Sequence, residues 1–169
     1  MSIKEIIQQL ESNQQVFKSL LVSKIETQYL WRPEPEKWNL LEIVCHLLDE
    51  ERDDFKARVV HALETPKKPL VPIDPEGWVK ERDYNARDYN QTLLDFLEER
   101  KQSVVWLKSK LDANWESKLL HPELGAMSAR LLLANWLAHD YLHIRQVLRY
   151  DYNYLKQRTK LDLGYAGNW

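Results

Sequence analysis

The sequence contains very little cysteine and glycine, and it has no long hydrophobic run. Its single cysteine, Cys45, excludes an internal disulfide and is typical of a reducing compartment. Only 4 of the 169 residues are glycine, which argues against an all-β or loop-rich architecture. No run of about 18 apolar residues is present, as a transmembrane helix would require, and residues 1–5 lack the apolar region of a signal peptide. We therefore expect a cytoplasmic protein without a membrane-spanning helix.

Charge of one sign is also scarce. The formal net charge is −2, so there is no electrostatic argument for binding nucleic acid or an anionic membrane. A hydrophobic fraction of 44% and a charged fraction of 30% are ordinary for a globular chain. The length predicts one domain covering residues 1–169. The 7 Trp and 8 Tyr residues indicate wide contact areas or a lined cavity.

Apolar residues recur at helical spacing along most of the chain and give no strand signal. The predicted helices cover residues 2 to about 30, 40 to about 64, about 83 to 111, and 128 to about 150 or 154. Connectors are expected at 65–82 and 112–127, and an irregular tail at 155–169. Asn39 and Glu42 have the spacing of a capping box at the start of the second helix, and Ser128 is a good N-cap for the fourth.

Four long helices predict an all-α four-helix bundle. A short connection with Pro33 and Pro35 makes the first two helices antiparallel neighbours. The Pro-rich loop 65–82 can span up to about 60 Å when extended, whereas the second helix is about 39 Å long. The loop can therefore cross back to the start of the second helix, which gives an up-down-down-up order.

The fourth predicted helix carries two histidines, His139 and His143, four residues apart. Residues at this spacing lie on the same face of a helix, which suits two ligands of one metal ion. Such a pair is common by chance, so the alternative is one satisfied core histidine and one surface histidine. The pair becomes informative only if another helix supplies a third ligand.

His46, on the second predicted helix, is that third candidate. It lies about 10 Å from the start of its helix, and the His139/His143 pair lies about 16 Å from the end of the fourth. In the up-down-down-up order these two helix ends lie at the same end of the bundle. The three imidazoles are then at nearly the same depth along the bundle axis. His61 is about 22 Å farther along the helix, and His121 lies in a connector. Neither is expected to join the site.

Three histidines from two helices suit Zn²⁺, Ni²⁺ or Fe²⁺ and leave an open coordination position for water or substrate. Glu50 follows His46 by four residues, so it is a candidate hydrogen-bond acceptor or general base. Its alternative is a solvated carboxylate within an acidic run. Asp140 is expected to point away from the site, Trp136 to be a core residue more readily than a pocket wall, and Cys45 to be a small buried residue.

These residues also carry a family resemblance. Trp38-Asn39, the run His46-Leu47-Leu48-Asp49-Glu50-Glu51 and the run His139-Asp140-Tyr141-Leu142-His143-Ile144-Arg145-Gln146 resemble the DinB/YfiT-like superfamily. The resemblance implies an up-down-down-up bundle, a divalent metal on His46, His139 and His143, and a homodimer. Related proteins often have a second histidine directly beside the last one; here Leu142 and Ile144 flank His143.

Three functions are compatible with this pattern. The resemblance implies a metal-dependent enzyme with a small-molecule substrate, of the type that transfers a low-molecular-weight thiol to an electrophile. The same three histidines could equally serve a metal-dependent hydrolase with a bound hydroxide as the nucleophile. The third possibility is a non-catalytic metal-binding or interaction bundle. Fold alone cannot choose among them.

Overall fold

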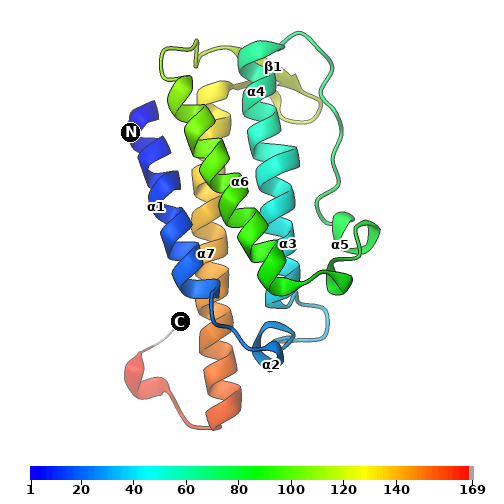
Figure 1. Ribbon diagram of the computed structural model, residues 1–169, viewed down its shortest axis with the longest axis vertical. Coiled ribbons are helices and arrows are strands. Elements are labelled where there is room, and N and C mark those ends of the chain that lie inside the picture. Colours follow the sequence, from blue (N-terminus) through cyan, green and yellow to red (C-terminus); the bar gives the residue numbers. More distant parts are fainter. Residues whose placement is uncertain (168–169) are drawn as a thin grey trace.

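The computed structural model describes residues 1–167, which form a bundle of long helices (Figure 1). Its long helices are α1 (Ile3–Leu21), α6 (Tyr89–Ser109), α7 (Ala129–Thr159) and a continuous helix built from α3 (Leu40–Asp49), a π-helical segment η1 (Glu50–Phe55) and α4 (Lys56–Glu64). The short elements are α2 (Glu26–Tyr29), α5 (Trp78–Glu81), the 3-10 turns η2 (Tyr84–Ala86) and η3 (Gly164–Ala166), and the antiparallel strands β1 (Lys118–His121) and β2 (Gly125–Ser128).

Polar contacts between helices give the direction of each one. Where residue numbers increase together in the contacts between two segments, the segments run parallel. They do so for α3–α4 with the segment around α6, and for the segment of α1 and the residues just after it with α7. The pairs are Asp49 with Arg87, Glu64 with Lys110, Asn13 with Asp140, and Lys24 with Asp151. The segment between α4 and α5 runs back along the bundle, so α6 starts at the same end as α3 (Figure 1).

The helix that carries His46 begins at a capping box. The side chain of Asn39 accepts a hydrogen bond from the Glu42 backbone amide at 2.9 Å, and Glu42 accepts one from the Asn39 amide at 2.9 Å. Arg32 holds the Glu42 carboxylate through two bonds of 2.7 Å. These bonds satisfy amide groups that a helix start leaves unpaired, and they fix the depth at which His46 enters the bundle.

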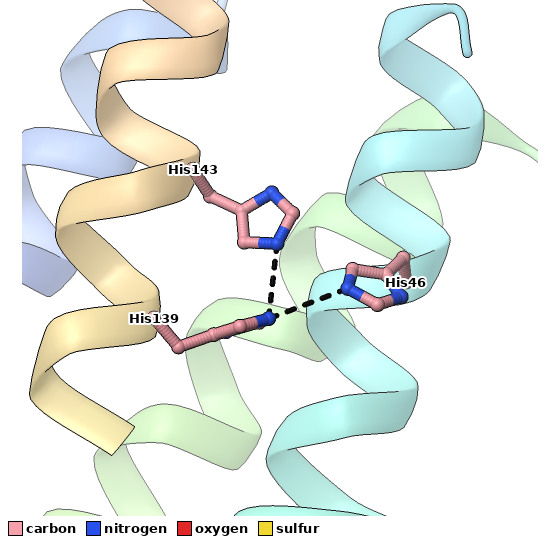
Figure 2. A group of neighbouring side chains, drawn as sticks. All are labelled: His46, His139 and His143. Carbon is pink, nitrogen blue, oxygen red and sulfur yellow. Dashed lines mark hydrogen bonds between the residues drawn. The ribbon is translucent and has the colours of Figure 1, made fainter. Parts of the chain in front are cut away.

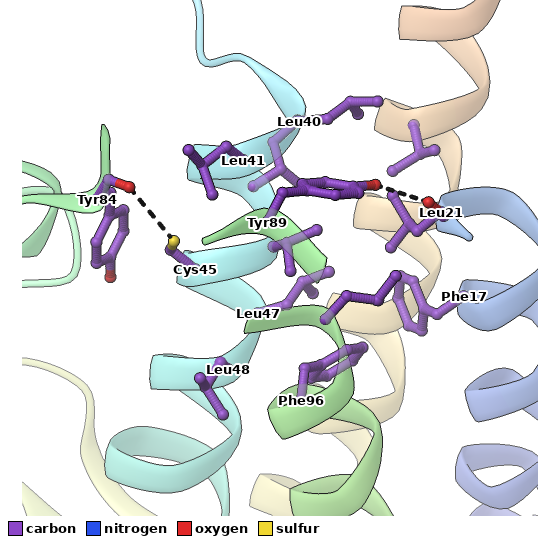
Figure 3. Close-up of a cluster of buried hydrophobic side chains, with 14 of the residues drawn as sticks. Phe17, Leu21, Leu40, Leu41, Cys45, Leu47, Leu48, Tyr84, Tyr89 and Phe96 are labelled. Carbon is purple, nitrogen blue, oxygen red and sulfur yellow. Dashed lines mark hydrogen bonds between the residues drawn. The ribbon is translucent and has the colours of Figure 1, made fainter. Parts of the chain in front are cut away.

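Two clusters of buried apolar side chains fill the bundle, and one of them surrounds Tyr89 (Figure 3). The Tyr89 hydroxyl donates to the Leu21 carbonyl at 2.8 Å, and Phe17 meets Phe96 edge to face with ring centres 5.4 Å apart. Cys45 is fully buried in this cluster, and burial raises its thiol pKa to about 12. Its expected role as a small buried residue is confirmed.

Several predicted helix boundaries are wrong, each for a local backbone reason. The first helix ends at Leu21 instead of about residue 30, because Ser23 adopts a left-handed conformation with φ 72°. The third begins at Tyr89 instead of about residue 83, because Asp83 is left-handed with φ 44° and Asp88 forms the N-cap. It ends at Ser109, two residues earlier than expected.

The region after α6 was predicted to lack strands, but β1 and β2 form a short hairpin there. Gly125 allows its turn by adopting φ 73°. The fourth helix continues to Thr159, so the first part of the expected irregular tail is helical. Tyr165 beyond it is fully exposed, while Trp169 lies outside the described residues. Between residues 1 and 167, no helix combines the length and apolar character needed to cross a bilayer.

Candidate metal centre

The three predicted histidines meet between α3 and α7 (Figure 2). His139 Nε2 lies 3.0 Å from His143 Nε2 and 3.4 Å from His46 Nε2. One ring nitrogen of each residue lies within 4.8 Å of the other two. His46 and His143 are buried and His139 is partly buried. The structure thus brings together residues separated by 93 positions in the chain.

Burial decides the charge state of these imidazoles. Desolvation lowers the pKa of His46 to about 3 and that of His139 to about 2, with further lowering by the neighbouring histidines. It also lowers the pKa of His143, against a hydrogen bond to Gln146 that raises it. All three rings are therefore neutral near pH 7, and neutral imidazole is the form that binds metal.

The spacing of the three rings fits a small divalent cation. Nitrogen ligands about 2.0–2.1 Å from a tetrahedral zinc ion lie about 3.3 Å apart, close to the observed separations of 3.0 and 3.4 Å. Three imidazole nitrogens that face one another without protons repel, and a cation among them removes that repulsion. The donor set could thus hold a divalent metal, whose identity the geometry leaves open among zinc, nickel and iron.

Gln146 fixes the orientation of one candidate ligand. Its Oε1 lies 2.7 Å from His143 Nδ1, so that nitrogen carries the proton and donates it. The Nε2 lone pair of His143 then faces the other two rings, as a metal ligand requires. In contrast, His46 Nδ1 is buried and has no hydrogen-bond partner in the described chain. In the sequence, Gln146 stands out only as part of the family resemblance.

Aromatic rings wall the site on two sides. The Trp38 ring lies 4.9 Å from that of His46, and the Phe55 ring lies 4.7 Å from that of His139. Phe55 belongs to the π-helical segment, and the sequence alone did not single it out. Trp136 packs in the core and stacks with Phe55 at 6.1 Å, so the reading of Trp136 as a core residue is the correct one.

Glu50 is buried, not solvated. It begins the π-helical segment one turn after His46, and only 4% of its surface is exposed. Desolvation raises its pKa to about 7, although the charge of Arg58 opposes the rise. A carboxylate with a pKa near neutrality can accept a proton and release it again at physiological pH.

Asp140 points away from the histidines, as expected, but into a buried ionic cluster that the sequence did not reveal. Arg100 donates to both carboxylate oxygens of Asp140 at 2.8 and 2.7 Å, and to both of Glu51 at 2.8 Å. Asn13 donates to Asp140 at 3.0 Å, and the Trp136 indole donates to Glu51 at 2.8 Å. Charged residues on otherwise apolar helix faces could have indicated a buried ionic cluster. The sequence pattern does not show which of these residues pair with one another.

The two remaining histidines stay outside the site, as predicted. His61 Nε2 lies 3.0 Å from the Lys68 carbonyl, and His121 Nδ1 accepts from the backbone amides of Glu123 and Leu124 at 3.2 Å. Within residues 1–167, the three-histidine group alone gathers enough His, Cys, Asp or Glu ligands for a metal.

The fold and the site together define a four-helix bundle with a candidate metal centre between two of its helices. The model of the DinB superfamily matches residues 9–147, and the chain belongs to this superfamily. The structure is also similar to that of YfiT from Bacillus subtilis, a probable metal-dependent hydrolase with an unusual four-helix bundle topology. That match has a TM-score of 0.76 and 17% identity, and it covers 95% of this chain and 89% of YfiT. A search of curated proteins gave no match.

Proposed function

We propose that the chain is a divalent-metal-dependent hydrolase whose metal is held by His46, His139 and His143. The observation that carries the proposal is the convergence of three neutral imidazole nitrogens at separations that suit one cation. Three protein ligands leave a coordination position for a water molecule or a substrate. The shared fold with YfiT, which is described as a probable metal-dependent hydrolase, supports this choice of reaction.

When bound, the metal would polarise a carbonyl group and lower the pKa of a bound water. The protein's own side chains would orient the ligands, limit the access of water and transfer the proton. Gln146 orients His143 by accepting its Nδ1 proton, and Trp38 and Phe55 restrict the access of water around the rings. The Glu50 carboxylate, with its pKa near 7, accepts a proton from the attacking water and returns it to the leaving group.

Transfer of a small thiol is the second candidate reaction. An open metal position can hold a thiolate as readily as hydroxide, and the resemblance to thiol-dependent transferases motivates this alternative. A homodimer and a cytoplasmic location stay predictions of the sequence. A non-catalytic bundle is the remaining possibility, and the experiments below separate all three.

The first experiment measures metal content. Protein purified without added metal is analysed for zinc, nickel and iron, alongside His46→Ala, His139→Ala and His143→Ala. We expect near-stoichiometric metal in the natural sequence and a loss in each variant. His61→Ala is the matched control, because His61 lies on the same continuous helix outside the site. Full metal content in all three site variants would refute the metal centre.

The second experiment tests the reaction. The metal-loaded protein is screened with ester and amide substrates and with pairs of a thiol and an electrophile. We expect hydrolysis, and Glu50→Gln should lower kcat by about 10²–10⁴-fold while leaving metal content unchanged. Turnover of thiol pairs alone would favour the transferase. An unchanged kcat in Glu50→Gln would remove that residue from the mechanism.

A further inference from the structure

A cavity of about 380 Å³ opens between the start of α3 and the C-terminal half of α7. Two residues that line it also touch the histidines. Trp38 packs against His46 with ring centres 4.9 Å apart, and Gln146 bonds His143 at 2.7 Å. The cavity therefore adjoins the candidate metal centre along the groove between α3 and α7.

The lining of the cavity combines apolar and charged side chains. Trp38, Ile43 and Tyr150 supply aromatic and apolar surface. Lys37 and Arg149 bring two positive charges, and Glu34 brings one negative charge. The formal charge of the lining is thus +1, on a chain whose net charge is −2.

Neither of these two cations is paired with an acidic side chain in the described part of the chain. Nearby Lys24 and Arg32 are held by Asp151 and Glu42, at 2.5 and 2.7 Å. Within residues 1–167, Lys37 and Arg149 form no ion pair. Two such cations in the lining of one cavity suit an anionic group, and the planar guanidinium of an arginine matches a carboxylate with two parallel hydrogen bonds.

We propose that this cavity binds a substrate that carries a carboxylate at the end remote from the bond that is cleaved. Lys37 and Arg149 bind the carboxylate, and the apolar wall contacts a short linker. Arg149 follows His143 by six residues, a rise of about 9 Å, which sets the distance between the reacting carbonyl and the carboxylate. The inference rests on the proposed hydrolase: water adds across the ester or amide bond, its hydroxyl joining the carbonyl carbon and its hydrogen joining the leaving oxygen or nitrogen.

Binding of metal-chelating probes tests the inference without turnover. Calorimetry on the zinc-loaded protein compares adipic acid monohydroxamate, which carries a carboxylate, with the neutral hexanohydroxamate of the same length. We expect the carboxylate probe to bind about 10-fold tighter, because it adds a charge-assisted hydrogen-bond pair. The preference should weaken as salt is raised.

Substitutions in the cavity lining test which residues cause the preference for the carboxylate probe. Lys37→Gln combined with Arg149→Gln should remove the 10-fold preference and leave the affinity for hexanohydroxamate unchanged. Arg145→Gln, an exposed arginine on α7 outside the cavity lining, is the matched control and should retain it. Glu34→Gln should strengthen binding of the carboxylate probe, because it removes the one negative charge of the lining.

The outcomes separate the two proposals. Equal affinity for both probes, or a preference that survives the double variant, overturns the carboxylate site while the metal centre stands. If neither probe binds, or if both bind equally well to metal-free protein, the metal centre and the carboxylate site both fail. Melting temperatures of the variants within a few degrees of the natural sequence show that the cavity, not folding, is being tested.

Discussion

Two polar clusters lie side by side inside the bundle and differ in how completely they are satisfied. In the ionic cluster, Arg100 directs its three guanidinium nitrogens at Glu51, Asp140 and the Leu10 carbonyl. In the histidine cluster, three Nε2 atoms face one another, and His46 Nδ1 has no partner in the described chain. Within residues 1–167, the ionic cluster pairs its charges, whereas one ring nitrogen of the histidine cluster has no partner.

Adjacent residues on one helix belong to different clusters. Asp140 is part of the ionic cluster, whereas its neighbour His139 is part of the histidine cluster. Successive residues of a helix point about 100° apart, so adjacent positions can serve different neighbours. The comparison indicates that the ionic cluster needs no further partner to support the fold, whereas the histidine cluster could accept a metal ion.

The largest effect on stability is expected from a substitution that breaks the ionic cluster. Arg100→Met leaves two carboxylates buried without their cation, and removing one partner of a buried ion pair costs about 3–5 kcal/mol. We expect a loss of that size in the free energy of unfolding, measured by urea titration. Arg145→Met, an exposed control, should change it by less than about 0.5 kcal/mol. A change below about 1 kcal/mol for Arg100→Met would contradict a structural role.

Acid should affect the histidine cluster in the metal-free protein. The folded pKa values of His46 and His139 are about 3 and about 2, below the unfolded value of about 6.5. The unfolded chain therefore binds more protons between these limits, so stability falls as pH drops below about 6.5. Each such histidine contributes about 1.4 kcal/mol per pH unit, or about 2 kcal/mol between pH 6.5 and 5.

The variant His139→Leu isolates this contribution. Its free energy of unfolding should fall less steeply with acid than that of the natural sequence. The difference should be the contribution of one histidine, about 2 kcal/mol between pH 6.5 and 5. Urea titrations at pH 7, 6 and 5 with a chelator present measure the difference. Identical slopes for the two proteins would show that the imidazole is not buried in its neutral form.

The smallest expected effect concerns the support of a single ligand. Gln146→Leu removes the acceptor of the His143 Nδ1 proton, and loss of such a hydrogen bond lowers metal affinity by about 10–100-fold. Gln146→Glu keeps an acceptor and should restore most of the affinity. Asn13→Leu, which removes a bond to Asp140 in the ionic cluster, is the control. Competition with a zinc chelator gives the affinities, and equal values for Gln146→Leu and the natural sequence would contradict this role.

The sequence predicted the four-helix bundle and the three histidines because both depend on regular spacing. Apolar periodicity marked the helices, and counting residues from their ends brought His46 level with His139 and His143. Arg100 was missed because its partners Glu51 and Asp140 lie 49 and 40 residues away, and a buried ion pair has the same residue types as a surface one. The burial of Glu50 was left undecided because it depends on what packs over an acidic run.

The separation of the ligands along the chain has a consequence for biosynthesis. His46 leaves the ribosome 93 residues before His139, a delay of roughly 5–20 s at ordinary rates of translation. A nascent chain that ends before α7 contains one of the three proposed ligands, so the proposed centre would be incomplete in it. Metal would therefore be acquired after α7 has been made and has docked, and it would stabilise finished molecules selectively over interrupted ones.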